Sequence, residues 1–255
     1  MSYKSAILTK AILISICLIS IRETQAADGK ILNGVAYFGD SQTAEGGIGD
    51  NLKCMSHDRI IGFHSAGAAV YARKTADDCL LPAAYQKESP DNYVMKTLTI
   101  QGKTSERQLV RCDAALKRFQ AVLALDNKTV NTIVVALGDN HSKAKDFRLL
   151  LSEIKAAGKK CVWVMPSMKV QEDFEAEKSI QEDMEIAIEY CGQQAIINPS
   201  RNPGQMDVKY ETVSDHKHYV KTEGAKIAKI ICDQLPLALS QNAKSPTGSS
   251  AKPIR

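Results

Sequence analysis

Short apolar runs alternate with amphipathic stretches along most of the chain, and this order constrains the fold more than any other feature. Strands that are apolar throughout and separated by helices indicate a parallel sheet covered on both faces. We therefore expect an α/β fold with a central, doubly wound parallel sheet of about five strands. The predicted strands are residues 34–39, 59–64, 131–138, 160–166 and 194–198, and the predicted helices are residues 145–157, 171–190 and about 218–235, the last ending before Pro236.

Two segments do not fit this alternation. Residues 85–110 are polar, and we expect a surface excursion there with one short strand at MKTLTI, residues 95–100. Residues 240–255 are low in apolar content, which predicts a disordered tail. Residues 27–239 would then form the single folded domain.

The N-terminus has the three zones of a secretory signal peptide. Lys4 and Lys10 precede an apolar run over residues 11–21, and Thr24-Gln25-Ala26 supplies the small-residue end, so we expect cleavage after Ala26. The apolar run is too short for a permanent anchor, and no other segment approaches ~20 uninterrupted apolar residues. We expect an exported protein, periplasmic or secreted, in which residues 1–26 are removed.

The balance of charge gives no indication of a nucleic-acid partner. Removing 26 of the 255 residues takes away three cations and one anion, which lowers the formal net charge from +4 to +2. Lysines and arginines are scattered, and no basic run is interleaved with aromatic residues. Solvated helix faces explain this distribution better than a binding surface.

Six of the seven cysteines remain after cleavage, and an even number in an exported chain favours disulfides. No two of them have the close C-x-x-C spacing of a zinc site. The sequence does not fix the pairing. Our working assignment joins Cys54 to Cys79 and Cys161 to Cys191, because each pair brackets one short excursion.

The stretch VAYFGDSQT, residues 35–43, raises the question of function, because an apolar strand stops there on Gly39-Asp40-Ser41. In a doubly wound sheet, ligands gather at the carboxyl ends of the strands, and Ser41 follows such an end. Asp40 or Ser41 could simply cap the next helix. A nucleophile elbow of the G-x-S-x-G type is not supported, since Thr43 replaces its second glycine.

Two further groups of polar residues supply partners for a reactive serine. Asn140 follows the third predicted strand, which places an amide at the same sheet edge as Ser41. Asp215 stands three residues before His218, so the carboxylate can hold one ring nitrogen while the other accepts the serine proton. Taken singly, Asn140 could be a turn residue and Asp215 a helix cap. His216 is a rival base, ranked lower because side chains of adjacent residues rarely face each other.

Together and in order, these residues resemble the SGNH (GDSL-type) hydrolase family over about residues 34–235. The matching blocks are GDS at 39–41, Gly67 in HSAGAAVYAR, Gly138-x-Asn140 and Asp215-x-x-His218, and the departures are Gln42, His141 and Tyr219. The resemblance implies a flavodoxin-like, three-layer α/β/α sandwich and ester hydrolysis through an acyl-serine intermediate. It implies an oxyanion hole built from the backbone N–H groups of Ser41 and Gly67 and the Asn140 amide, with Gly62 as a competitor of Gly67. No metal or organic cofactor is required.

Polar residues flank the proposed site and favour a sugar substrate. They are Gln42, Asp139, His141 and Arg73, whereas His57 and His64 are interpreted as surface or packing residues. We expect an exported carbohydrate O-acyl esterase, above all a deacetylase acting on a glycan. The alternatives are a lipase, lysophospholipase or thioesterase, and a secreted binding protein that keeps the fold without turnover.

Overall fold

The computed structural model describes residues 31–72, 80–82, 85, 93–100, 102–137, 143–166, 174–199 and 218–242, and the predicted leader lies outside them. A parallel five-stranded sheet with the order β2-β1-β6-β7-β8 forms the centre of the fold. The prediction of such a sheet is confirmed, and each predicted strand is present, most of them shorter than expected. The strands are β1 (Gly34–Gly39), β2 (Ile60–Gly62), β6 (Val130–Ala136), β7 (Lys160–Val164) and β8 (Ile196–Ile197).

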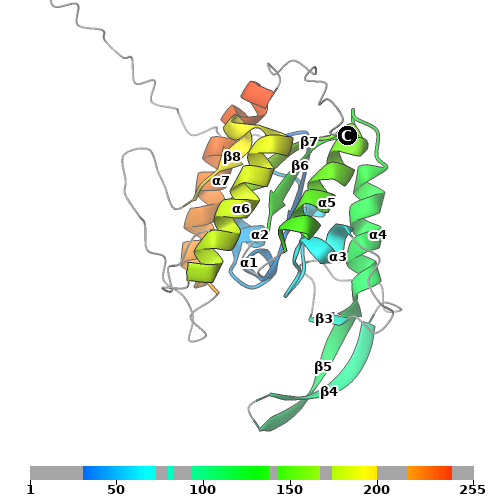
Figure 1. The fold of residues 1–255 in the computed structure, drawn as a ribbon. Coiled ribbons are helices and arrows are strands. Elements are labelled where there is room, and N and C mark those ends of the chain that lie inside the picture. The colour runs from blue at the N-terminus through cyan, green and yellow to red at the C-terminus, as the bar shows by residue number, and fades with distance from the viewer. Residues whose placement is uncertain are drawn as a thin grey trace, which may run out of the picture.

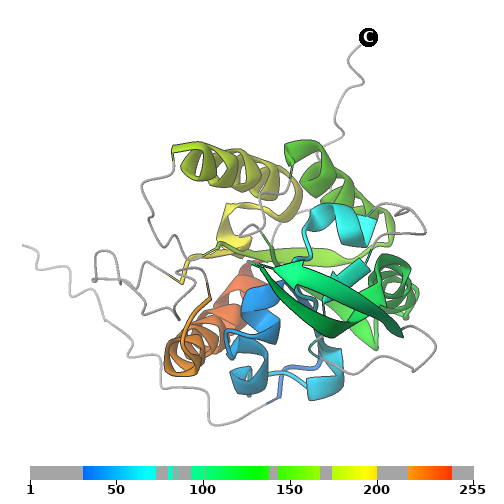
Figure 2. The same ribbon diagram turned by 90° about the horizontal axis from the view of Figure 1, so that it is seen from below.

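Helices cover both faces of this sheet, as Figures 1 and 2 show. On one face lie α3 (Ala68–Ala72), α5 (Ala144–Ala156) and α6 (Phe174–Cys191), and α4 (Cys112–Leu123) packs beside α3. The other face carries α1 (Ser41–Ala44), α2 (Ile48–Asn51) and α7 (Lys221–Asn242). Two short 3-10 helices are η1 (His57–Arg59) and η3 (Gln193–Ala195). This arrangement is a three-layer α/β/α sandwich, as predicted.

Aromatic side chains fill the core between the sheet and its helices. The ring of Phe38 in β1 meets the rings of Tyr71 in α3 and Phe119 in α4 edge to face, with centroids 5.5 and 5.1 Å apart. Farther along the sheet, Trp163 in β7 packs on Phe147 in α5. All five side chains are fully or almost fully buried. These aromatic contacts therefore hold α3, α4 and α5 against β1 and β7.

A second, antiparallel sheet corrects the prediction for residues 85–110. Its strands are β3 (Leu80–Pro82), β4 (Tyr93–Ile100) and β5 (Lys103–Arg111), in the order β3-β5-β4. Only the strand at MKTLTI was predicted. The prediction that the rest of residues 85–110 is irregular was wrong for the residues of β5. Gly102 joins the two long strands with a φ of 76°, a conformation that glycine adopts without strain, and this turn signal was missed.

The last helix runs past Pro236 to Asn242, so its predicted end before the proline was wrong. A proline inside a helix removes one backbone hydrogen bond. Buried apolar side chains on both sides of Pro236 offset this loss, since Leu235 and Ala238 are buried and Leu239 packs against the core. The helix thus also includes the first residues of the segment that we expected to be a disordered tail.

Disulfides join distant parts of the domain. Cys161 and Cys191 are bonded, as predicted, and Cys112 is disulfide-bonded as well. Cys54 pairs with Cys232, so the predicted Cys54–Cys79 bond was wrong. The reason is spatial, because α2 packs against α7 and brings the two cysteines to a Cα–Cα distance of 5.5 Å. These bonds are compatible with an exported protein. No helix of the described part of the chain is long and apolar enough to cross a membrane.

Removing the Cys54–Cys232 disulfide should lower the free energy of unfolding by about 2–5 kcal/mol, because this bond closes a loop of 178 residues in the unfolded chain. The double variant Cys54→Ser/Cys232→Ser, unfolded in urea beside the wild type, measures this loss. The matched double variant at Cys161 and Cys191, which opens a loop of 30 residues, should lose less. Equal losses in the two double variants would contradict the chain-entropy explanation.

A buried carboxyl in α6 makes stability depend on pH. Asp183 is 1% exposed, and burial, together with the adjacent Glu182 carboxylate, raises its pKa to about 7. The folded protein therefore retains a proton that the unfolded chain, with an aspartate pKa of ~3.9, releases. The free energy of unfolding therefore falls as the pH rises from ~4 towards ~7, because the folded protein must then either keep this proton or bury a charge.

Asp183→Asn should therefore raise the melting temperature by about 2–8 °C near pH ~8 and by much less near pH ~4.5. Thermal melts at both pH values measure the difference. Glu182→Gln is the matched control, because it removes only the neighbouring charge and should have a smaller effect. An equal gain at both pH values would mean that the carboxylate of Asp183 is not the cause.

Candidate functional site

Ser41 is the first residue of α1, directly after the carboxyl end of β1 in the middle of the sheet. Asp40 caps this helix, because its side chain accepts a hydrogen bond from the Gln42 N–H at 3.0 Å. The capping role considered for Asp40 is thus observed, and it leaves the Ser41 hydroxyl unused. Ser41 is 7% exposed, and among the described residues neither its hydroxyl nor its backbone N–H makes a hydrogen bond. Both groups remain available to a ligand.

Thr43 occupies the place where a nucleophile elbow would have its second glycine. A Cβ atom on Gly62 would lie 2.7 Å from the Thr43 Cγ2 atom, and a Cβ on Gly39 would overlap the same side chain. Both glycines are therefore required by close packing of α1 on the ends of β1 and β2. This explains Gly62 without an oxyanion role and favours its competitor, Gly67.

The helix α3, which follows Gly67, is hydrogen-bonded to the end of β1. Gly67 directly precedes this helix and is half-buried. The hydroxyl of Tyr71, one turn into α3, donates a 2.7 Å hydrogen bond to the Gly39 carbonyl, two residues before Ser41. Tyr71 is completely buried, and burial raises its pKa well above the usual range, so this hydroxyl keeps its proton.

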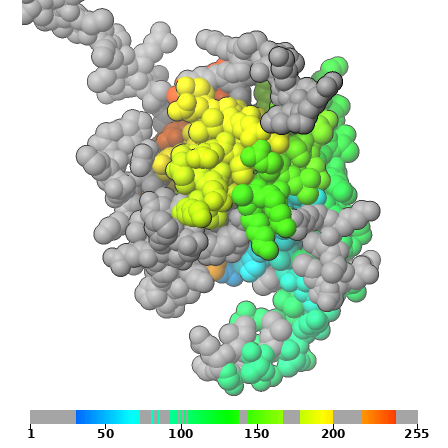
Figure 3. Space-filling model, viewed as in Figure 1, coloured from blue at the N-terminus to red at the C-terminus, as the bar shows by residue number. Residues whose placement is uncertain are grey.

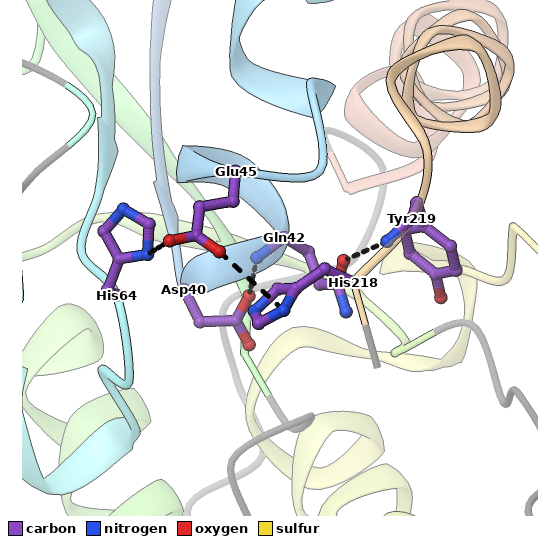
Figure 4. A network of polar contacts seen from close by, with 6 residues as sticks. All are labelled: Asp40, Gln42, Glu45, His64, His218 and Tyr219. Atoms are coloured by element: carbon purple, nitrogen blue, oxygen red, sulfur yellow. Dashed lines mark hydrogen bonds and ion pairs between the residues drawn. The ribbon is translucent and has the colours of Figure 1, made fainter. Parts of the chain in front are cut away.

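The start of α7 approaches the same point from a remote part of the sequence. A Cβ atom on Gly224 would overlap the Gly46 carbonyl, so only glycine permits this contact between α7 and the turn after α1. The Tyr219 N–H donates a 3.3 Å hydrogen bond to the Gln42 side-chain oxygen, across 177 residues of sequence. His218 is consequently placed next to the helix that carries Ser41 (Figure 4).

Glu45 connects two histidines at this edge of the sheet (Figure 4). Its carboxylate oxygens lie 2.7 Å from Nδ1 of His64 and 3.8 Å from Nδ1 of His218. We did not predict a role for Glu45, and we interpreted His64 as a surface or packing residue. The signal was its spacing: Glu45 stands four residues after Ser41, and its N–H donates to the Ser41 carbonyl, so both lie on one face of the turn.

His64 is poised to be neutral in this cluster. Its side chain is 13% exposed, and burial lowers its pKa. The Glu45 carboxylate raises the pKa and His218 lowers it, with a net decrease. A direct hydrogen bond between Ser41 and His218 is not among the contacts of the described residues. The cluster therefore shows two imidazoles near the helix that begins with Ser41, each with a ring nitrogen facing the Glu45 carboxylate.

A pocket opens beside α1 at the carboxyl ends of the strands, bounded on its other side by α7. Asp40, Gln42 and Thr43 form its polar wall. The remaining lining is mostly apolar: Tyr37, Ile48, Ala136, Leu137, Val164, Met165, Pro166, Pro199, Tyr219, Ile227 and Ile231. Ser41, Gly67 and His218 are not among its lining residues, so the pocket adjoins the helix of Ser41 without including the serine.

Several predicted site residues lie outside the described residues, namely Arg73, Asp139, Asn140, His141, Asp215 and His216. The structure places His218 next to Tyr219, whose N–H bonds to Gln42 on the helix that begins with Ser41. It places Gly67 directly before α3, which is hydrogen-bonded to Gly39 through Tyr71. Within the described ranges, no group of three or more His, Cys, Asp or Glu side chains is arranged to hold a metal ion.

Comparison with known proteins adds no family to this geometry. A scan against protein-family models finds no match, and a search of curated proteins finds none either. The class that the coordinates define is an α/β protein with a parallel sheet and a polar cluster at its carboxyl edge.

Proposed function

We propose that this protein is an exported serine hydrolase that removes O-acyl groups, above all acetyl, from a carbohydrate. The observation that carries the proposal is the Tyr219–Gln42 hydrogen bond, which ties His218 to the helix of Ser41 across 177 residues. A serine hydroxyl that makes no hydrogen bond among the described residues, on a helix tied to the segment of His218, supports nucleophilic catalysis, which needs a serine and a base within reach of each other. The disulfides support export, to the periplasm or the exterior.

In the proposed reaction, Ser41 Oγ attacks the ester carbonyl and His218 accepts its proton. The C–O bond to the sugar then breaks, and His218 returns the proton to the leaving oxygen. Water attacks the acyl-serine with His218 again as base, which releases the carboxylic acid and restores the serine. The N–H groups of Ser41 and Gly67 and the amide of Asn140 stabilise the oxyanion in each half of the cycle.

A carboxylate must hold the other ring nitrogen of His218 in this scheme, and two residues are candidates. Asp215 is expected from the sequence pattern. Glu45 is the carboxylate observed near Nδ1 of His218, although it is 52% exposed and shared with His64. The half-exposed position of Glu45 supports an auxiliary role in orienting the two rings, with Asp215 as the principal partner.

Glu45→Gln should lower the pKa of His64 further, because the carboxylate is the group that raises it against the effect of burial. NMR titration of the imidazole resonances measures this shift. We expect kcat to fall only about threefold to tenfold, since the proposed principal partner, Asp215, remains. An unchanged His64 titration would contradict the contact, and a loss as large as that of Asp215→Ala would make Glu45 the principal partner.

The substrate class is tested with a chain-length series of nitrophenyl esters and with acetate release from acetylated glycans. The polar residues predicted to flank the site favour a sugar, and a site for a long acyl chain would need a sizeable apolar groove. We expect kcat/KM to be highest for acetyl esters. A value that climbs steadily with chain length, at ~0.8 kcal/mol per buried methylene, would instead support a lipase or thioesterase.

A further inference from the structure

A β-hairpin arm formed by β4 and β5 projects beyond the body of the protein (Figures 1 and 3). Only its base is buried, through Leu109 and Val110, which pair with Val94 and Tyr93. From the pair Met95–Gln108 to the turn, every described side chain is exposed, and Met95 reaches 60%. Six residue pairs extend the arm by about 17 Å at ~3.4 Å per step.

The length of the arm is not explained by folding, because an isolated two-stranded ribbon is at best marginally stable in water. β4 is an edge strand that pairs with β5 alone. The projecting part of the arm buries none of its described side chains in the core. An exposed edge strand of this kind presents unpaired backbone N–H and C=O groups to which a binding partner can attach.

One face of the arm carries a charge arrangement that opposes its own folding. Lys96 lies directly opposite Arg107 in the antiparallel register, and both are exposed. Like charges at opposite positions destabilise a pair of strands. Within the described part of the chain, no acidic side chain forms an ion pair with either cation, and Glu106 lies on the other face, opposite Thr97. An anion bound between the two cations would relieve the repulsion.

The arm starts at the same edge of the central sheet as Ser41. β5 runs directly into α4, which leads back to the amino end of β6, so the base of the arm stands at the carboxyl ends of the strands. Tyr85, which precedes β4 in the sequence, also lies close to α1: its N–H donates to the Gly62 carbonyl, and Gly62 packs against Thr43. A ligand on the arm would extend away from Ser41.

We propose that the arm binds an anionic polysaccharide, so that the O-acyl ester cleaved at Ser41 belongs to a long acidic chain. This inference rests on the proposed function for the cleavage and on Lys96 and Arg107 for the acidic polymer. A polymer chain meets both requirements, because it can extend from the site along the arm and can carry repeated carboxylates. A small neutral ester would not engage the arm.

Lys96→Glu is the decisive variant, because it removes the repulsion and creates an opposite-charge pair with Arg107. The arm should then be at least as well folded, while its net charge falls by two. With O-acetylated polygalacturonate and nitrophenyl acetate as probes, the ratio of polymer to small-ester kcat/KM should fall about threefold to tenfold. Thr97→Lys, which faces Glu106 on the opposite side, is the matched control and should keep the ratio.

Further measurements separate the alternatives. Raising the ionic strength should reduce the wild-type ratio towards that of the Lys96→Glu variant, because exposed charges are screened. An unchanged ratio in the variant, or an equal loss on neutral acetylated xylan, would overturn the inference. The inference would also be overturned if the protein sedimented with anionic phosphatidylglycerol vesicles in a Lys96-dependent way while the kcat/KM ratio stayed unchanged. The arm would then be assigned to binding a membrane surface.

Failure of the proposed function can be distinguished from failure of this inference. Binding of unacetylated polygalacturonate by the Ser41→Ala variant is measured without any turnover. Binding that weakens in Ser41→Ala/Lys96→Glu supports the arm even if no ester is cleaved. Esterase activity without Lys96-dependent binding would support the proposed hydrolase function and overturn the inference that the arm binds a polysaccharide.

Discussion

Ser41→Ala is expected to reduce ester hydrolysis by at least ~10³-fold in kcat, because no other group in the proposed mechanism forms the acyl-enzyme. The fold should be retained. The Ser41 hydroxyl makes no hydrogen bond among the described residues, and Asp40 caps α1 through its own side chain, so the substitution removes nothing that holds the helix. Hydrolysis of nitrophenyl acetate and thermal melting, measured on the same preparation, separate the two effects.

Ser56→Ala is the matched control for this variant. Ser56 is an exposed serine whose hydroxyl bonds to Asp58, away from the polar cluster at α1. It should keep full activity. Turnover in Ser41→Ala within about tenfold of the wild type would remove Ser41 as nucleophile, since loss of a nucleophile costs far more than that.

The second large effect is expected for His218→Ala, which should lose about as much activity as Ser41→Ala, because the two residues act as a unit. A double variant should be little worse than either single variant. His216→Ala and His64→Ala are the matched comparisons and should each lose less.

Three outcomes would revise this assignment. Loss at His216 with His218 dispensable would make His216 the base. If His64→Ala lost as much activity as His218→Ala, His64 would have a direct role in proton transfer. Additive losses in the Ser41→Ala/His218→Ala double variant would show that the serine and the histidine do not act in one step.

The sequence predicted the sheet and the position of Ser41 because both depend on strong local signals. Buried parallel strands are apolar on both faces, and β1 stops on a glycine and a helix cap, so the carboxyl edge is visible in the pattern. We expected His218 to lie near Ser41 because it follows Asp215 by three residues, the spacing of a carboxylate–histidine pair. The contact itself depends on Gly224 packing against Gly46, which no local pattern reveals.

The features that were missed depend on distance in space. Cys54 and Cys232 meet only because α2 packs on α7, so a rule based on nearby cysteines chose the wrong partner. Glu45 and His64 belong to adjacent strand ends, and their contact needs the crossing of α1 over β2. The arm was missed at β5 because a polar, exposed ribbon lacks the apolar alternation by which strands are recognised.

Labelling with a fluorophosphonate probe, followed by mass spectrometry of the modified peptide, tests the central claim most directly, because only an activated serine reacts with such a probe. We expect the label on Ser41, with little or no labelling after His218→Ala or in the denatured protein. A folded protein that hydrolyses esters while Ser41 stays unlabelled, or that carries the label on another residue, would contradict the assignment of Ser41 as the nucleophile.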